Sequence, residues 1–454
     1  MKLFGTDGIR GAVNQFPMTP DIIQRVAMSA AQQLIENSPI TSSKQHRPTV
    51  VIGKDTRLSG YMLESALTSG FLSMGIDVML VGPLPTPAVA MLTRTLRAHL
   101  GVMISASHNP FKDNGIKFFD SQGFKLSGAQ ERYIEESTQN GQFSLATAEK
   151  IGKARRVDDA LGRYNEFVKS SFPKGMRLDG LRIVVDCANG AAYKVAPQLL
   201  WELGADVIAI GNTPDGININ LECGATYIQP LQEAVVHHQA NIGIALDGDA
   251  DRLIVVDEKG QVLDGDQIMA LIAKLWLEQG LIKGSGIVAT HMSNLGLERF
   301  LLSKGLQLFR SNIGDKYVLE MMQTKGCNVG GEQSGHIILS DYATTGDGLL
   351  AALQVLALMV AANIPASEIG HTFEPVPQVL CNIRTHSAIN LNDERIRGAI
   401  DAATIRLENY GRLLVRQSGT EPLIRIMAQG DDANLLDDVI KNIRGTITEM
   451  DKAC

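Results

Sequence analysis

The sequence predicts an α/β protein with three similar α/β domains of parallel or mixed sheets and a smaller C-terminal α+β domain, around a central cleft. Three observations predict this fold class. The 454 residues are enough for about three or four domains of roughly 150 residues each. Short apolar strands alternate with helical segments three times, which is typical of βαβ units and parallel sheets. The end of the chain shows a different pattern of strands and helices.

The first repeat begins with an apolar strand over 49–53 (TVVIG), followed by the polar loop GKDTRLSG. A helical stretch from Tyr61 to Gly75 and a strand from Val78 to Val81 come next. A further strand over 101–105 (GVMIS) then opens into the segment ASHNP. These elements define a predicted domain I over residues 1–152.

The second repeat has strands over 181–185, 206–210 and 242–246, with a helix ending at Leu203, and its last strand opens into DGDAD. The third has strands over 286–290 and 306–311, a helix from Val318 to Thr324, and the loop NVGGEQSGH. In each repeat a polar loop follows the carboxyl end of a strand, where open α/β sheets bind ligands. We therefore predict domain II at 153–258 and domain III at 259–366.

The C-terminal part differs from the three repeats. The apolar stretch from Leu349 to Ala362 is 14 residues long, which is shorter than the ~20 residues of a membrane span and predicts a buried core helix. A linker over 363–370 (NIPASEIG) leads into a predicted domain IV at 370–454. Its predicted elements are strands over 378–384, 412–416 and 424–428 and a helix over 433–450.

Composition excludes several classes of protein. The 42 Lys and Arg residues against 49 Asp and Glu give a net charge of −7, whereas nucleic-acid-binding domains usually carry excess positive charge. The N-terminus MKLFGTDGIRG has no apolar core of signal-peptide length. Five scattered cysteines form no CxxC pair, so neither a disulfide framework nor a zinc site is indicated. We expect a soluble, cytoplasmic chain with no nucleic-acid or membrane partner.

The sharpest motif is Asp247-Gly-Asp249-Ala-Asp251-Arg252, directly after the apolar strand over 242–246. Three carboxylates at this spacing converge only if the backbone turns around a cation, and hard oxygen ligands favour Mg²⁺ or Ca²⁺. An EF-hand is disfavoured because Arg252 occupies the sixth position, where that loop needs glycine. A phosphatase with Asp247 as nucleophile is an alternative. A purely structural acidic turn is poor, because the carboxylates would repel one another.

A second motif places Ser107 and His108 on a loop at a strand end, followed by Lys117. A serine in this position suits a nucleophile or a phosphate carrier. The segment lacks GxSxG, so a hydrolase triad is weakly supported. Taken alone, the segment favours a structural turn closed by Pro110 over a catalytic loop.

Three further segments carry polar groups among turn residues. The loop GGEQSGH offers Glu332, Ser334 and His336, which suit hydrogen bonding to sugar hydroxyls. The segment RQSGTEP, with Arg416 and the later Arg425, combines guanidinium groups, hydroxyls and backbone N–H groups into a phosphate cradle. The N-terminal GTDGIRG places Arg10 in a turn. There is no Walker A sequence, which disfavours a nucleotide triphosphatase.

Taken together and in this order, FGTDGIRG, SASHNP, DGDADR, GEQSGH and RQSGTEP resemble the α-D-phosphohexomutase superfamily. The likeness covers essentially the whole chain, and several motifs in the right order are far more specific than one. FGTDGIRG and the GEQSGH form of the sugar loop favour the bacterial branch that acts on glucosamine phosphates over phosphomannomutase/phosphoglucomutase. The superfamily fold of three α/β domains and a fourth, smaller one around a cleft agrees with the repeat.

The resemblance also implies residue roles. Ser107 would be the phosphoserine, and one Mg²⁺ per active site would be held by Ser107, Asp247, Asp249 and Asp251. The sugar hydroxyls would be bound by Glu332 and Ser334. The catalytic set would be Ser107, His108, Lys117, Arg10, Arg252 and His336. The phosphate that does not react would be bound by Arg416, Ser418, Gly419, Thr420 and Arg425. By motif position the general base is His336 or Lys117, with Asp315 as a third candidate.

The implied reaction interconverts glucosamine 6-phosphate and glucosamine 1-phosphate, with glucosamine 1,6-bisphosphate as intermediate and activator. It would feed the synthesis of UDP-N-acetylglucosamine and cell-wall precursors. The same chemistry on glucose or mannose phosphates is the nearest alternative, and a silent sugar-phosphate-binding protein is another. The partner is a small phosphosugar, and a homodimer is compatible with the sequence. Ala250 stands where many relatives have glycine, which matters only if that residue adopts a positive φ.

Overall fold

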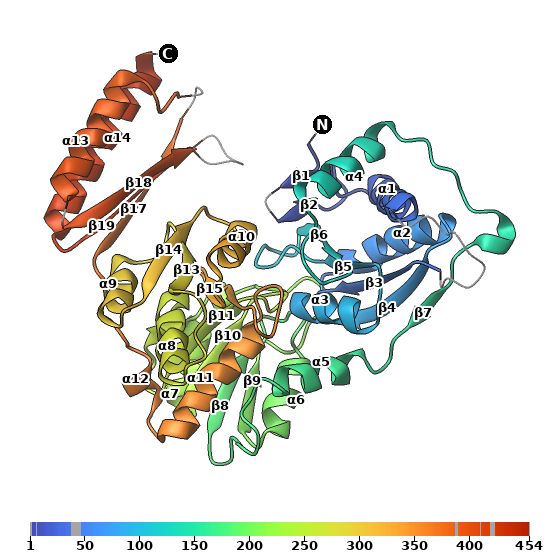
Figure 1. Ribbon diagram of the computed structural model, residues 1–454, viewed down its shortest axis with the longest axis horizontal. Helices are drawn as coiled ribbons and strands as arrows, with labels where there is room; N and C mark the ends of the chain where they lie inside the picture. The colour runs from blue at the N-terminus through green and yellow to red at the C-terminus, as the bar shows by residue number, and fades with distance from the viewer. Residues whose placement is uncertain are drawn as a thin grey trace.

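The computed structural model describes residues 2–5, 7–37, 47–385, 389–408, 410–417 and 423–453. The elements follow one another around an arc in Figure 1, from the blue N-terminal group at the upper right to the orange-red C-terminal group at the upper left. The described residues form sheets of seven, five, four and three strands. Three α/β units and a smaller C-terminal α+β unit confirm the predicted fold class.

The first sheet has the strand order β1-β2-β6-β5-β3-β4-β7. Its strands are β1 (Phe4–Gly5), β2 (Gly8–Ala12), β3 (Thr49–Lys54), β4 (Asp77–Pro83), β5 (Leu100–Ile104), β6 (Asp113–Asp120) and β7 (Ala154–Arg156). The accompanying helices are α1 (Pro20–Asn37), α2 (Ser59–Ser73), α3 (Thr86–Thr95) and α4 (Gly128–Asn140). Strand β7 pairs with β4, so this sheet continues a few residues past the predicted end of domain I at 152.

The second sheet has the order β12-β11-β10-β8-β9. It contains β8 (Arg182–Asp186), β9 (Asp206–Ile210), β10 (Ile242–Leu246), β11 (Leu253–Asp257) and β12 (Val262–Leu263), with helices α5 (Ala160–Lys169), α6 (Val195–Glu202) and α7 (Gln229–His237). The third sheet has the order β14-β13-β15-β16. It contains β13 (Gly286–Thr290), β14 (Gln307–Ser311), β15 (Val329–Gly331) and β16 (Ile337–Leu339), with α8 (Gly265–Glu278), α9 (Leu295–Ser303), α10 (Asp315–Lys325) and α11 (Gly348–Ala362).

The three sheets share one internal pattern. In each, the first strand of the repeat lies between two parallel neighbours, and a fourth strand adds antiparallel to the third. The equivalent sets are β4-β3-β5-β6, β9-β8-β10-β11 and β14-β13-β15-β16. The repeat predicted from the sequence is therefore a repeat of topology. The loop from the third strand to the fourth is equivalent in all three units.

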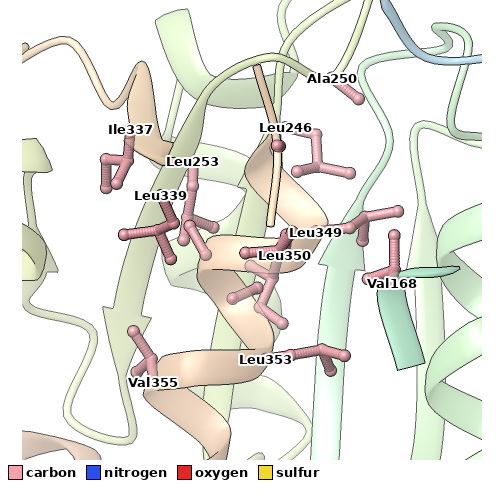
Figure 2. Close-up of a cluster of buried hydrophobic side chains, with 14 of the residues drawn as sticks. Val168, Leu246, Ala250, Leu253, Ile337, Leu339, Leu349, Leu350, Leu353 and Val355 are labelled. Atoms are coloured by element: carbon pink, nitrogen blue, oxygen red, sulfur yellow. The ribbon is translucent and has the colours of Figure 1, made fainter. Parts of the chain in front are cut away.

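Helix α11 is the buried core helix that the apolar stretch predicted. Leu349, Leu350 and Leu353 on this helix are at most 1% exposed. Figure 2 shows these side chains among leucines and an isoleucine from neighbouring strands and a valine from α5, namely Leu246, Leu253, Ile337, Leu339 and Val168. This apolar cluster runs without a break through all three α/β units. The helices of the described ranges include none that is both long and apolar enough to cross a membrane.

The C-terminal unit has an antiparallel sheet with the order β17-β19-β18. Its elements are β17 (Gln378–Arg384), β18 (Gly411–Gln417), β19 (Leu423–Gly430), α13 (Glu394–Leu407) and α14 (Ala433–Ala453). It has an apolar core of its own, built from both helices and the strands. The predicted linker over 363–370 is not entirely irregular, because α12 (Ala366–Ile369) lies within it. Pro365 at its N-terminus and the buried Ala366 explain this short turn of helix.

Replacing Leu353 with alanine should remove a central contact of the core around α11. We expect Leu353→Ala to lower the free energy of unfolding by about 2–5 kcal/mol, since it leaves a cavity in a packed interior. Denaturant titration followed by circular dichroism measures this change. Leu302→Ala is the control, because Leu302 lies on α9 and is 60% exposed. Equal losses in both variants would contradict the assignment of α11 to the core.

Candidate active site

Ser107 lies in the loop between β5 and β6, and it is 2% exposed. Its φ of 52° is in the left-handed region, a strained conformation that often marks functional positions in non-glycine residues. The Ser107 Oγ donates a hydrogen bond to Asp247 Oδ2 at 2.6 Å. His108 Nδ1 lies 3.4 Å from Ser107 Oγ. The serine of the first repeat therefore contacts the acidic loop of the second.

Arg57, which sequence analysis did not single out, holds this loop in place. It is fully buried and pairs through Nε with Asp55 Oδ2 at 2.8 Å. Its remaining nitrogens donate to the main-chain carbonyls of Ser107 (2.9 Å), Asn109 (2.8 Å), Pro110 (2.5 Å) and Asp113 (3.0 Å). Asp55 also accepts from Ser105 Oγ, which in turn accepts from the Ser107 N–H. A fixed guanidinium thus determines the backbone around Ser107.

The three aspartates of the second loop lie close together and are buried. One carboxylate oxygen from each of Asp247, Asp249 and Asp251 lies within 4.8 Å of the others. Burial, together with repulsion from Asp251 and Asp249, raises the pKa of Asp247 to about 7. Asp249 Oδ1 has no hydrogen-bond partner among the described residues. Buried, mutually repelling carboxylates with a free oxygen fit a bound cation, so this loop could hold a metal ion.

The backbone of this loop allows the serine loop to approach closely. A Cβ on Gly248 would lie 2.6 Å from the Ser107 carbonyl oxygen, so only glycine fits between the first two aspartates. Ala250, which stands where many relatives have glycine, adopts a positive φ of 56°. The position therefore does have the backbone conformation that favours glycine. The left-handed conformation costs a non-glycine residue about 1–2 kcal/mol. Gly348 at the start of α11 donates its N–H to the Ala250 carbonyl and supports this conformation.

Lys117, on β6, is a buried cation against the acidic loop. Its Nζ lies 2.9 Å from Asp249 Oδ2, 3.2 Å from Asp251 Oδ2 and 3.2 Å from Asp7 Oδ2. Burial alone would lower the pKa of Lys117, but these carboxylates outweigh it and raise the pKa well above its usual value. Arg10 pairs with Asp7. The Arg252 Nε lies 3.9 Å from Asp247 and 4.0 Å from Asp251.

The loop between β15 and β16 is the predicted sugar loop. Glu332 accepts from the Gly314 N–H at 3.1 Å and from Ser334 Oγ at 3.1 Å. Gly335 has a φ of 93°, and a Cβ there would lie 2.2 Å from the Leu253 carbonyl oxygen. This loop therefore packs on the strand that follows the acidic loop, and the predicted glycines permit the contact.

His336 at the end of this loop connects it to the aspartates. Its Nδ1 lies 3.5 Å from Asp251 Oδ1, its Nε2 lies 3.7 Å from Asp315 Oδ2, and the Gly346 N–H points at Nε2 from 3.2 Å. Burial alone would lower the pKa of His336, but the nearby carboxylates outweigh it and raise the pKa to about 9. In contrast, burial and the arginines at positions 252 and 10 lower the pKa of His108 to about 4.

The predicted phosphate cradle is described only in part. Arg416 on β18 and Arg425 on β19 are directly opposite each other in the sheet register. Burial and the nearby Arg425 lower the pKa of Arg416, as expected where two cations share a site suited to an anion. Ser418, Gly419 and Thr420 lie outside the described residues.

The structure brings together Ser107, His108, Lys117, Arg10, Arg252, His336 and the three aspartates. Besides Arg57, sequence analysis missed Lys125, which pairs with both Asp7 and Asp315. It also missed Thr86 at the start of α3, which donates its hydroxyl to Asp249 and its N–H to the Asp249 carbonyl. A charged D-x-R triplet at the end of an apolar strand could have pointed to Arg57. The contacts of Lys125 and Thr86 are with residues distant in the sequence, so no local sequence pattern indicated them.

Comparison with known proteins explains this arrangement. Models of phosphoglucomutase/phosphomannomutase domains match in order: α/β/α domain I at 1–145, α/β/α domain II at 162–260, α/β/α domain III at 264–375 and the C-terminal domain at 381–446. A phosphoglucosamine mutase from Sphingopyxis alaskensis is 59% identical over 442 residues, 97% of this chain and 98% of the relative. The chain belongs to the phosphoglucomutase/phosphomannomutase family. The resemblance found in the sequence motifs is thereby confirmed.

Other members of the family extend the comparison. A phosphoglucosamine mutase from Agrobacterium fabrum is 56% identical over 453 residues and covers 100% of this chain and 99% of the relative. The crystal structure of a phosphoglucomutase/phosphomannomutase family protein from Burkholderia thailandensis superposes with a TM-score of 0.82. It is 22% identical and covers 98% of this chain and 97% of its own. At that identity the likeness supports the fold.

Removing the Arg57 side chain should destabilise the serine loop. Arg57→Met leaves Asp55 as an uncompensated buried charge and removes a donor from four carbonyls, of which those of Ser107 and Asn109 keep Asn220 Nδ2 and that of Pro110 keeps the Asp113 N–H. We expect a loss of about 3–5 kcal/mol in the free energy of unfolding, mainly from the buried charge. Denaturant titration measures it. The matched control is Arg177→Met, which removes an arginine from an exposed ion pair with Asp179 and should leave the unfolding midpoint unchanged. A stable Arg57→Met protein would contradict the positioning role.

Proposed function

We propose that this chain interconverts glucosamine 6-phosphate and glucosamine 1-phosphate through a phosphorylated Ser107. The observation that carries the proposal is the 2.6 Å contact between Ser107 Oγ and Asp247 within the buried aspartate cluster. It places a serine hydroxyl beside a candidate metal site, with the sugar loop adjoining it through His336. Relatives named phosphoglucosamine mutase are 56–59% identical over nearly the whole chain, which supports an isomerase acting on this substrate.

The reaction consists of two phosphoryl transfers. In the first, the 1-hydroxyl of glucosamine 6-phosphate attacks the phosphorus on Ser107; the O1–P bond forms and the Oγ–P bond breaks. The bisphosphate then turns around. In the second, Ser107 Oγ attacks the 6-phosphate and the O6–P bond breaks, which leaves glucosamine 1-phosphate. In each transfer one proton passes overall from the attacking hydroxyl to the leaving oxygen.

The chain's own residues supply charge and position for these transfers. Lys117 is held protonated by three carboxylates, so we assign it as a fixed cation and not as the base. Arg10 and Arg252 add positive charge beside it, as transfer of a phosphoryl group requires. By the same reasoning His336, whose pKa the nearby carboxylates raise to about 9, is assigned as a proton donor, and Asp315 remains the candidate base. Hydrolysis of phosphoserine would stop the cycle, so burial of Ser107 at 2% exposure protects it.

We assign Mg²⁺ to the aspartate cluster, since carboxylate oxygens are its preferred ligands. Asp247, Asp249 and Asp251 would hold it together with an oxygen on Ser107. Bound there, the ion would neutralise charge on the transferring phosphoryl group.

The sugar and the distal phosphate are assigned to two further places. Glu332 and Ser334 would bind sugar hydroxyls, and Arg416, Ser418, Gly419, Thr420 and Arg425 would bind the phosphate that does not react. Both Glu332 oxygens accept hydrogen bonds that fix their orientation. The C-terminal unit would then close over the substrate and exclude water. It contacts the third unit through a bidentate pair, Arg299 with Asp431, at 2.6 and 2.9 Å.

The remaining assignments concern the cell and the chain as a whole. We propose a cytoplasmic enzyme that supplies precursors of UDP-N-acetylglucosamine and the cell wall, with a phosphosugar as its partner and neither nucleic acid nor membrane. The number of subunits stays open, with a homodimer as one arrangement. The proposed division at 1–152, 153–258, 259–366 and 370–454 lies within about a dozen residues of the limits of the family models, but the first sheet extends to Arg156 and the second to Leu263, so the first two boundaries belong a few residues later.

Two alternatives use the same residues. Glucose or mannose phosphates differ from glucosamine phosphate only at C2, so initial rates with all three test the substrate; the poorest rate with glucosamine phosphate would overturn our assignment. A phosphatase with Asp247 as nucleophile is less well supported, because Ser107 donates to this carboxylate and burial raises its pKa. Inorganic phosphate as the main product would favour it.

Ser107→Ala removes the oxygen that would carry the phosphoryl group. We expect turnover of glucosamine 6-phosphate to fall by about 10²-fold or more, with phosphosugar binding retained. A coupled assay measures turnover, and peptide mass analysis locates phosphate in the unaltered protein. Ser303→Ala, at the exposed end of α9, is the control and should keep full activity. Full activity of Ser107→Ala, or phosphate on another residue, would overturn the role of Ser107.

Chelation of divalent cations should abolish turnover, and Mg²⁺ should restore it. Asp249→Asn should weaken Mg²⁺ binding by at least about 10-fold, because one of three converging charges is lost. Isothermal titration with Mg²⁺ measures this independently of activity. Asp341→Asn, whose carboxylate pairs with Lys283 away from the aspartate cluster, should bind Mg²⁺ as the unaltered chain does. Equal binding by Asp249→Asn would remove this residue from the metal site.

A further inference from the structure

Six charged or ionisable side chains form a closed ring that includes residues from all three α/β units. In order around the ring they are Asp7, Lys117, Asp251, His336, Asp315 and Lys125. Carboxylates alternate with nitrogen groups, so each carboxylate lies between two nitrogens. Asp7, Lys117 and Lys125 come from the first sheet and its loops, Asp251 from the second unit, and His336 and Asp315 from the third.

We propose that Lys125 is a positioning residue for phosphoryl transfer, which holds Asp315 in place and through it sets His336 against the aspartate cluster. The inference rests on the proposed function. Lys125 lies in the segment between β6 and α4 and makes direct ion pairs with Asp7 and with Asp315, the first residue of α10. It therefore closes the ring across the junction of the first and third units.

Asp315 depends on Lys125 more than any other carboxylate of the ring does. Without Lys125, Asp7 keeps its ion pairs with Arg10 and Lys117. Asp315 keeps, among the side-chain ion pairs of the described residues, only His336 at 3.7 Å, besides a hydrogen bond from its neighbour's backbone N–H. Removing Lys125 therefore frees the Asp315 carboxylate to turn, and His336 loses the carboxylate nearest its Nε2, although the Gly346 N–H stays beside that nitrogen at 3.2 Å.

Burial makes this contact consequential. The Lys125 side chain is 16% exposed and the Asp315 side chain 13% exposed, so water replaces a lost partner poorly. Burial alone would lower the pKa of Lys125, but Asp315 and Asp7 outweigh it and raise the pKa. The ammonium stays charged and holds both carboxylates. A displacement of about 1 Å in a reacting group costs about 10²-fold in rate, so the orientation of His336 is expected to matter for turnover and less for binding.

A neighbouring ion pair offers a matched control. Lys316 Nζ lies 3.3 Å from Glu131 Oε2 and joins the same two units, from α10 to α4. Its side chain is 28% exposed, and it contacts no member of the ring through that side chain in the described ranges. If Lys125 acted only as a tether between units, loss of Lys316 would have a similar effect.

The test compares Lys125→Met, Lys125→Arg, Lys316→Met and Asp315→Asn in the full chain, with glucosamine 6-phosphate as substrate. We expect Lys125→Met to lower kcat by about 10- to 100-fold with KM changed less than about threefold. Lys125→Arg should recover most of the rate, and Lys316→Met should stay near the unaltered rate. Lys125→Met combined with Asp315→Asn should be about as slow as the slower single variant, since both remove the Lys125–Asp315 contact and Asp7 keeps its pairs with Arg10 and Lys117.

An equal loss in Lys316→Met, an unchanged kcat in Lys125→Met, or multiplying losses in the double variant would overturn the proposal. If Lys125→Met does not fold, Lys125→Gln, which removes the same charge and keeps a polar side chain, takes its place. A second readout does not need turnover. The imidazole resonance of His336, assigned with His336→Gln, should shift in Lys125→Met and stay in Lys316→Met. An unaltered chain that fails to convert glucosamine 6-phosphate would refute the proposed function, while this resonance would still decide the role of Lys125.

Discussion

The burial of three carboxylates within 4.8 Å of one another is the constraint on which the site depends. Asp247, Asp249 and Asp251 repel one another, and their removal from water is costly unless positive charge compensates it. Among the described residues of the second unit, Arg252 is the one cation that pairs with these carboxylates. The further nitrogens come from Lys117 on the first unit and His336 on the third. The charge of one loop therefore requires the three units to dock together, and the site exists only where they meet.

The repeated topology explains why these loops meet. In every unit the loop from the third strand of the repeat to its antiparallel fourth strand carries proposed site residues: the serine between β5 and β6, the aspartates between β10 and β11, and the proposed sugar loop between β15 and β16. These three equivalent loops contact one another through Ser107 with Asp247 and through Asp251 with His336, and each carries different side chains. The strained backbones of Ser107 and Ala250, with φ of 52° and 56°, lie at these equivalent edges.

The sequence predicts those features whose evidence lies in a short run of neighbouring residues. The strands at 206–210, 242–246 and 286–290 match the structure because short apolar, β-branched runs next to polar loops need no distant information. The motif residues could be named because their spacing resembles a family. Arg57, Lys125 and Thr86 were missed, since their contacts are with residues distant in sequence or with backbone carbonyls that any sequence offers. Helix α3 was also missed: it is ten residues long, has Pro87 in its first turn and contains three threonines, so its sequence is a poor helix former.

The apolar core has a consequence for how the chain folds. One cluster runs from Val51 through Leu246 to Leu353, so α11 cannot complete its packing until β10, β11 and α5 are in place. The C-terminal unit keeps a separate core. The first three units share this cluster and should therefore gain and lose structure together, although the first unit has a second apolar cluster of its own. Among the described residues, the C-terminal unit shares no cluster with the others and can fold as an autonomous one. The family models divide the chain into four domains. From the apolar clusters we expect two units of cooperative unfolding, the three α/β units together and the C-terminal unit.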